Sequence, residues 1–171
     1  MLIQNDFINE IRKNIDVKKK IWNNIDGTNC YAYALGIDVS EYKLKEDIFS
    51  PGVISNSKVN LTRHEYFSYD LLMDNLFSDF KALGIEYRLV EPLDEILEDE
   101  WKIALFVSEI GNNLLDDFHF MRQFSDGIWH HKNGYYGLVS EYDNKGKIIT
   151  NPMDCSLRQR SYDKCFCLKL K

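Results

Sequence analysis

The chain has 171 residues, of which 44% are hydrophobic and 13% aromatic, and its formal net charge is −6. This composition excludes a disordered chain and is typical of a globular one long enough to bury a core. The acidic balance without a concentrated basic patch argues against nucleic-acid binding, and no apolar run approaches the ~20 residues of a membrane span. We therefore expect a single domain over residues 1–171, with residues 1–28 as a helical lead-in.

The segment Met1 to Phe7 lacks the basic and long apolar parts of a signal peptide. Synthesis in the cytoplasm is expected, although an export route without a signal peptide would leave no such mark. In a reducing compartment the cysteines are expected to be free thiols. A metal site built from Cys155, Cys165, Cys167 and a histidine is the alternative, but its spacing is not that of a known zinc motif. No metal and no other cofactor is expected.

The first part of the chain predicts short helices. Asn5 or Asp6 is the expected N-cap of a first helix, whose apolar positions recur at helical spacing from Phe7 to Ile15, and a second helical piece runs to Trp22. After a loop, Thr28 or Asn29 is the expected N-cap of a helix over Cys30–Leu35, which Gly36 closes.

Residues 37–61 show no periodicity and are expected to form an ordered loop near the cleft, with a turn at Ser50-Pro51-Gly52. Thr62 and Glu65 form a capping-box pattern, which predicts a helix that starts there and ends at Gly84.

The second half predicts strands separated by turns. The expected strands are Ile85–Val90, Trp101–Glu109, Phe118–Phe124, Ile128–His131, Tyr135–Glu141, Ile148–Thr150 and Cys165–Lys169. Helices followed by antiparallel strands indicate an α+β domain.

Two of these strands form a predicted hairpin around Ser125-Asp126-Gly127. A three-residue loop with glycine in the left-handed conformation pairs Phe124 with Ile128, and it puts His119 and His131 on one face as diagonal neighbours. A two-residue Asp126-Gly127 turn is the alternative, and it turns His130 to that face instead.

Cys30 is expected in the first turn of its helix. The partial positive charge and the unpaired amides there favour a thiolate, which is the nucleophilic form of cysteine. One amide of that turn can also help to bind an oxyanion. A cysteine at a helix start, followed by a histidine on a later strand, is the order found in papain-like cysteine hydrolases.

The motifs extend this resemblance. The run Asn29-Cys30-Tyr31-Ala32-Tyr33-Ala34 resembles the papain-like nucleophile helix, and the twelve-residue interval from His119 to His131 is similar to the two-histidine hairpin of NlpC/P60-type peptidases. The match is closer to a poorly characterised bacterial group with an N-C-Y-x-Y-A motif, a P-G loop, H-x-Y-R-Q-x-S-x-G-x-W-S-H-K-P-G and a late I-x-D/N-P. The corresponding residues here are 29–34, 51–52, 119–134 and 149–152.

The chain departs from this bacterial pattern within the hairpin. His130 stands for serine, Asn133 for proline, and Phe120-Met121 for an aromatic-tyrosine pair. None of these changes removes a proposed catalytic group. The D-C-S-G form of the NlpC/P60 cysteine motif is absent, so peptidoglycan specificity does not carry over.

The resemblance implies a papain-like fold, with N-terminal helices packed on an antiparallel sheet, and an enzyme that acts on an amide bond as a peptidase, amidase or deamidase. It makes Cys30 the nucleophile and His119 the base. For the group that orients the base, the NlpC/P60 pattern points to His131 and the papain pattern to Asn151, with Asp154 as a third option. Asn24 lies six residues before Cys30, where papain-like enzymes carry an oxyanion-binding glutamine. Tyr31 and Trp129 are candidate oxyanion or substrate-binding residues.

The same residues support other functions. Transfer to an amine instead of water would make the chain a transglutaminase or acyltransferase. A papain-like binding or inhibitory module would keep the fold and leave the thiol unused. The expected substrate is a peptide or protein, no partner protein is identified, and a bacterial effector, toxin or phage protein would suit the small size.

Overall fold

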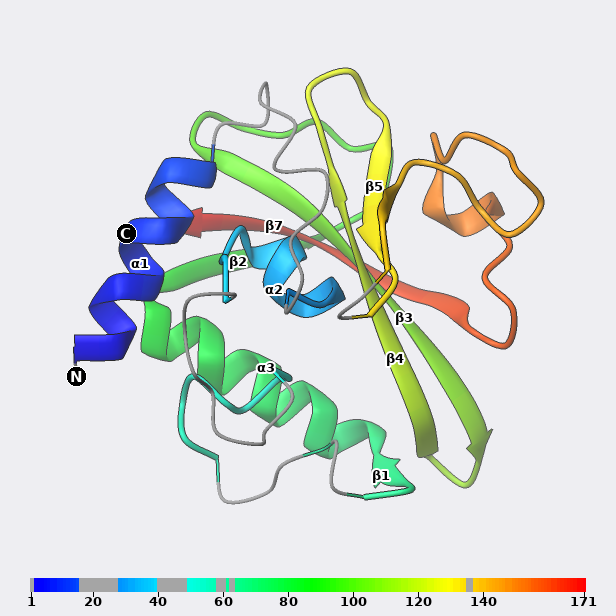
Figure 1. Cartoon of the computed structure of the whole chain (residues 1–171), viewed down its shortest axis with the longest axis horizontal. Helices are drawn as coiled ribbons and strands as arrows, with labels where there is room; N and C mark the ends of the chain where they lie inside the picture. The colour runs from blue at the N-terminus through cyan, green and yellow to red at the C-terminus, as the bar shows by residue number, and fades with distance from the viewer. Residues whose placement is uncertain (1, 16–27, 40–48, 58–60, 62–63, 135–136) are drawn as a thin grey trace.

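The computed structural model of the chain describes residues 2–15, 28–39, 49–57, 61, 64–134 and 137–171. Its described part combines helices with an antiparallel sheet, which confirms the α+β class. The helices are α1 (Leu2–Asn14), α2 (Cys30–Leu35) and α3 (Tyr69–Leu83), and Pro152–Asp154 forms a short 3-10 turn, η2. Figure 1 shows α2 between α1, α3 and the long strands of the sheet.

The sheet has an order that differs from the order of the chain. Its strands are β1 (Phe67–Ser68), β2 (Ile85–Val90), β3 (Glu100–Gly111), β4 (Leu114–Gln123), β5 (Trp129–Lys132), β6 (Val139–Ser140) and β7 (Ser161–Leu170). They follow each other as β2-β7-β3-β4-β5-β6, and β1 pairs with the start of β4. The late strand β7 therefore lies inside the sheet, between β2 and β3, as Figure 1 shows in red.

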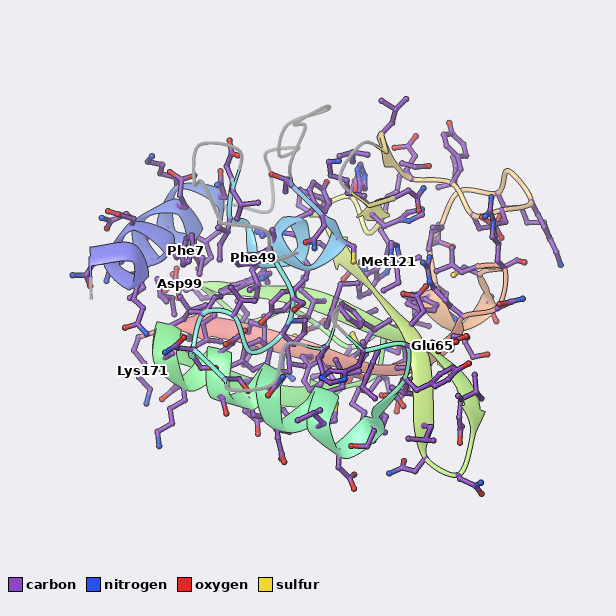
Figure 2. All side chains as sticks on the ribbon, turned by 60° about the horizontal axis from the view of Figure 1, so that its bottom comes forward. Phe7, Phe49, Glu65, Asp99, Met121 and Lys171 are labelled. Atoms are coloured by element: carbon purple, nitrogen blue, oxygen red, sulfur yellow. The ribbon has the colours of Figure 1, made fainter. Side chains whose placement is uncertain are left out.

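The two faces of the sheet are covered differently. Side chains alternate between the faces of a strand, and one set, including Leu105, Phe120 and Phe166, packs against α1, α2 and α3. The other set, including Phe106 and Met121, packs against residues from the segment after β6, among them Ile149. Figure 2 shows side chains filling the space between the sheet and α3.

The start of α3 differs from the prediction. Thr62 of the predicted capping box lies outside the described residues, but the predicted helix start is wrong. The N-cap of α3 is Ser68, whose hydroxyl accepts a hydrogen bond from the Leu71 amide at 3.1 Å. Phe67 and Ser68 pair with β4 as strand β1, so the helix cannot begin before this pairing ends. The predicted end at Gly84 is confirmed, with a left-handed φ of 68°.

Other boundaries of helices and strands also differ from the prediction. Helix α1 already begins at Leu2, before the predicted caps Asn5 and Asp6. The predicted strand Ile148–Thr150 is reduced to one bridge, between Tyr142 and Ile148. The predicted strand Tyr135–Glu141 is reduced to β6, and its first two residues lie outside the described part, as does the helical piece that was expected to reach Trp22.

Candidate active site

Helix α2 presents Cys30 as its first residue, as the sequence predicts. Asn29 is the N-cap: its side-chain oxygen accepts a hydrogen bond from the Ala32 amide at 3.1 Å, and its amide group donates to the Phe49 carbonyl. Gly36 ends the helix with a φ of 80°, and its carbonyl accepts a hydrogen bond from the side-chain amide of Asn14 at 2.8 Å. Both ends of α2 are therefore fixed by contacts with distant segments.

The hairpin between β4 and β5 has the predicted three-residue loop. The Phe124 amide donates to the Ile128 carbonyl at 3.0 Å, and Gly127 has a φ of 80°. Met121 pairs with His131, so the two-residue turn that would bring His130 to the shared face is excluded. His130 lies on the opposite face, where its ring packs at 4.6 Å from that of Phe124.

The shared register brings two buried histidines into contact. Nε2 of His119 lies 2.8 Å from Nδ1 of His131, and Nε2 of His131 lies 3.1 Å from the Tyr142 carbonyl oxygen. A carbonyl can only accept, so Nε2 of His131 carries its proton and donates it. In a neutral ring Nδ1 of His131 is then an acceptor, and Nε2 of His119 must donate to it. Nδ1 of His119 is left with a free lone pair, as a general base requires.

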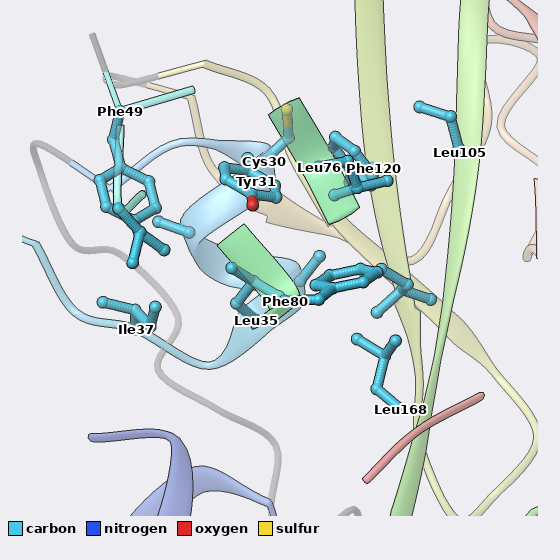
Figure 3. Packing of buried hydrophobic residues seen from close by; sticks show 14 of the residues in the cluster. Cys30, Tyr31, Leu35, Ile37, Phe49, Leu76, Phe80, Leu105, Phe120 and Leu168 are labelled. Carbon is cyan, nitrogen blue, oxygen red and sulfur yellow. The ribbon is translucent and has the colours of Figure 1, made fainter. Parts of the chain in front are cut away.

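Cys30 reaches the same strand at a gap in the sheet. On the edge of β4 away from β3, the pairing with β1 ends at Leu115 and the pairing with β5 begins at Met121. The start of α2 lies against this gap, and the Cys30 sulfur accepts a hydrogen bond from the backbone of Phe120. Figure 3 shows Cys30, Tyr31 and Phe120 together at this point. The thiol is therefore hydrogen-bonded to the backbone of the residue that directly follows His119.

The site is electrostatically neutral in its resting state. Burial raises the pKa of the Cys30 thiol to about 11, against a contribution from the Phe120 backbone that lowers it. Burial also holds the pKa of His119 well below 6.5, and it lowers the pKa of His131 against the effect of the Tyr142 carbonyl. Burial is the largest cause of the raised Cys30 pKa, so it disfavours the predicted thiolate. The directions of the three pKa shifts favour a thiol and two neutral imidazoles.

Arg160 is a site residue that the sequence analysis missed. It directly precedes β7, and the β7–β3–β4 register lays it across Ser108 toward Asp117. Its Nε donates to Oδ2 of Asp117 at 2.6 Å. The positive charge of Arg160 lowers the pKa values of Cys30, His119 and His131. No local pattern marks this residue, because it lies 43 positions from Asp117 in the chain.

Two predicted cleft residues have structural roles instead. Tyr31 is fully buried, and its hydroxyl donates to Oδ2 of Asp79 at 2.9 Å. Trp129 is also fully buried and packs in the cluster of Met121. Neither side chain is exposed to a substrate, so both expectations are corrected. The candidate oxyanion residue Asn24 lies outside the described residues.

The structure does not bring Asn151 to the histidine pair. Its side chain caps its own turn, accepting from the Met153 amide at 3.2 Å and donating to Asp154 at 3.0 Å. The side chains of Asn151 and Asp154 are thus hydrogen-bonded to each other. His131 takes the place beside His119, so Asn151 and Asp154 are not the orienting group in this arrangement.

The remaining cysteines do not gather with other ligands. Cys165 and Cys167 are buried and Cys155 is half-buried, and all three are free thiols. Within the described residues, no three His, Cys, Asp or Glu side chains are arranged to hold a metal ion. The alternative of a metal site at these cysteines therefore has no support in this part of the chain.

Comparisons with models of protein families, with curated proteins and with solved structures found no match in any of the three. In the described part of the chain, no helix has the length and apolar character needed to cross a membrane.

Proposed function

We propose that this chain is a papain-like cysteine hydrolase that cleaves or deamidates an amide bond through a thioester on Cys30. One observation carries the proposal: contacts run from the Tyr142 carbonyl through His131 to His119, and the backbone of Phe120, the residue after His119, is hydrogen-bonded to the thiol at the start of α2. These contacts assign the proton on each imidazole ring. They leave Nδ1 of His119 unprotonated.

In the proposed reaction, His119 acts first as a base. Nδ1 of His119 takes the proton of the Cys30 thiol as the sulfur attacks the carbonyl carbon, and the carbonyl oxygen becomes an oxyanion. The C–N bond then breaks as the same proton passes to the leaving amine, which gives a thioester. Water attacks the thioester with His119 again as base, and the acid and the free thiol are released.

His131 is assigned as the orienting residue. When His119 holds two protons, its Nε2–H donates to Nδ1 of His131, whose own Nε2–H is held by the Tyr142 carbonyl. This fixed direction of donation keeps the His119 ring in one tautomer and one orientation, which is the role of the third group in a catalytic triad.

The neutral resting state has a kinetic consequence. Because the Cys30 pKa is raised to about 11, few thiolates exist near neutral pH before substrate binds. Proton transfer must therefore accompany attack, and the unoccupied enzyme is expected to react slowly with small alkylating agents.

The test uses peptidyl vinyl sulfones, which occupy the cleft like a substrate and trap the attacking sulfur. One adduct is expected, on Cys30, by intact-protein mass spectrometry and peptide mapping. His119→Gln should slow its formation by ~10²-fold or more, the usual size of a general-base contribution. Cys155→Ala is the matched cysteine control and should label as the parent chain does. An adduct on another cysteine, or an unchanged rate in folded His119→Gln, would reject the assignment.

Hydrolysis and transfer are separated in a second step. A peptide library is incubated with the chain in water enriched in heavy oxygen, with and without added amines. Heavy oxygen in a Cys30-dependent product supports hydrolysis, and amine incorporation supports acyl transfer.

A binding module that does not use its thiol is the second candidate. It is favoured by the burial of Cys30, which is 8% exposed and has a raised pKa. The absence of both vinyl sulfone adducts and Cys30-dependent products would favour this candidate.

A further inference from the structure

The tight turn from Leu157 to Arg160, closed by a backbone bridge, forms a wall between two surface pockets. One pocket, of about 460 Å³, is lined by Arg158 and Arg160 together with Asp116 and Asp117. The other, of about 420 Å³, is lined by the same two arginines, but its remaining lining residues carry no charge. The second pocket is called the arginine pocket below.

The two arginines differ in their partners. Arg160 is held by Asp117, with Nη2 at 2.5 Å and Nε at 2.6 Å from the same carboxylate oxygen. The exposed Arg158 has no hydrogen bond or ion pair with any residue in the described part of the chain. It also has a φ of 44°, in the left-handed region that an arginine rarely adopts. The turn therefore presents one fixed and one unpaired guanidinium.

The other lining residues supply groups that suit an anion. Asn133 and Asn144 are among the lining residues, and an asparagine side chain can donate hydrogen bonds to a carboxylate. No Asp or Glu is among the lining residues, although the chain as a whole has a net charge of −6. The positive charge of the pocket is thus opposite in sign to the net charge of the chain. A preference for an acid at this pocket would therefore come from the two arginines and not from the net charge.

The arginine pocket is connected to the histidine pair along β5. Asn133, which lines the pocket, follows His131 by two positions, directly after the end of β5, and His131 contacts His119 at 2.8 Å. The charge of Arg160 also acts on both Cys30 and His119. A group of an extended substrate on the β5 side of the reacting bond is therefore expected to reach Arg158 and Arg160.

We propose that the arginine pocket is a substrate subsite that binds a carboxylate next to the bond attacked by Cys30. The inference rests on the proposed hydrolase function and adds a substrate class to it: peptides with an acidic group close to the reacting amide. A planar guanidinium matches a carboxylate through paired N–H donors, which a lysine would not provide. The acidic group is either a side chain of Asp or Glu or the terminal carboxylate of the peptide.

The test measures binding and does not depend on turnover. The full chain carrying Cys30→Ala is titrated by NMR with N-acetyl-alanyl-glutamate N-methylamide and with its glutamine counterpart. A second pair, N-acetyl-alanyl-alanine and its N-methylamide, separates a terminal carboxylate from a side-chain carboxylate. For at least one pair the acid should bind about five-fold more tightly, since a partly exposed ion pair contributes up to ~1 kcal/mol.

Variants then locate the effect. Arg158→Gln should bring the ratio of acid to amide affinity close to one, and Arg158→Glu should reverse it. Arg12→Gln removes the same charge from exposed Arg12 on α1 and should leave the ratio unchanged. Equal binding of acid and amide in both pairs would overturn the proposal, as would a preference that survives in Arg158→Gln.

The outcome is separable from that of the proposed function. Acid-selective binding lost in Arg158→Gln would support the subsite even if no Cys30-dependent product were found. Cys30-dependent cleavage without acid selectivity would reject the subsite and leave the hydrolase in place.

Discussion

The protonation states of individual residues determine how the site can work. Cys30 and the two histidines are buried, so each is favoured in its uncharged form. A thiolate–imidazolium pair would have to form inside a desolvated site, at a considerable cost in free energy. We infer that these charges develop only when a substrate is bound, because the carbonyl oxygen of the substrate then takes up the negative charge.

The choice between His131 and Asn151 as the orienting group gives a direct prediction. His131→Ala should lower turnover on the order of 10–100-fold, the typical effect of removing an outer partner of a functional histidine. Asn151→Ala should leave turnover unchanged, because its side chain bonds only to its own turn in the described structure. Steady-state rates are compared after circular dichroism confirms the fold. Equal losses in the two variants would contradict the assignment.

Some of this site was predictable from local sequence. Asn29 before Cys30 and glycine at the third position of the Ser-Asp-Gly loop fix a helix start and a strand register through neighbouring atoms alone. Arg160 was not predictable in this way, because only the pairing of β7 with β3 brings it to β4. The candidate Asn151 lies apart from the histidines for a local reason: an asparagine before proline caps its own turn more readily than it reaches a distant ring.

At the scale of elements, α2 is held in place by a buried carboxylate on α3. Asp79 accepts hydrogen bonds from the amides of Gly52 and Ser55 at 2.8 and 2.7 Å, and from the Tyr31 hydroxyl at 2.9 Å. One side chain thus ties the Pro51-Gly52 turn and helix α2 to α3. Its position explains why the residue after Cys30 is a buried tyrosine.

Removing one of these bonds should weaken the fold by a measurable amount. Tyr31→Phe is expected to lower the free energy of unfolding by about 1 kcal/mol or somewhat more, because a hydrogen bond to a buried carboxylate is lost. Tyr66→Phe removes an exposed hydroxyl bonded to Glu65 and should change stability by less than ~0.5 kcal/mol. Urea unfolding followed by fluorescence provides the comparison. Similar values for the two variants would contradict the role given to Asp79.

Elements were predicted best where their end signals are local. The predicted bounds of Cys30–Leu35 and Ile85–Val90 are confirmed, and both elements have glycine at one end. The start of α3 was predicted wrongly because a capping-box pattern carries no information about strand pairing. Phe67 and Ser68 are held by β4, which lies far along the chain.

At the scale of the whole molecule, the candidate site takes its residues from both faces of the sheet. Cys30 belongs to the cluster on the helical face, whereas His119 shares its strand face with Met121 of the opposite cluster. The candidate site and the stability of the fold therefore depend on the same buried histidines, His119 and His131.

This link predicts that acid destabilises the fold. The folded-state pKa values of His119 and His131 lie below 6.5, so the unfolded chain binds more protons as the pH falls. Their contribution to stability is complete above about pH 6.5 and is lost below it, by up to ~1.4 kcal/mol per pH unit for each histidine. Urea unfolding between pH 5 and 8 measures this slope.

Variants isolate the histidine contribution from that of other groups. His119→Gln should show a shallower loss of stability between pH 6.5 and 5 than the parent chain. His64→Gln changes an exposed histidine and should follow the parent curve. A parent chain that keeps its full stability at pH 5 would show that the histidines are not held neutral.

The position of β7 inside the sheet has a consequence for synthesis on the ribosome. Domains assemble from the N-terminus onward as they emerge, but here β2 and β3 are joined through a strand made after both of them. Cys30 therefore leaves the ribosome long before its partners can be fixed, and a helix of 6 residues does not persist alone in water. Until β7 has been translated, the sheet against which α2 packs is incomplete. The arrangement of Cys30, His119 and His131 on which the proposed function depends is therefore complete only with the final strand.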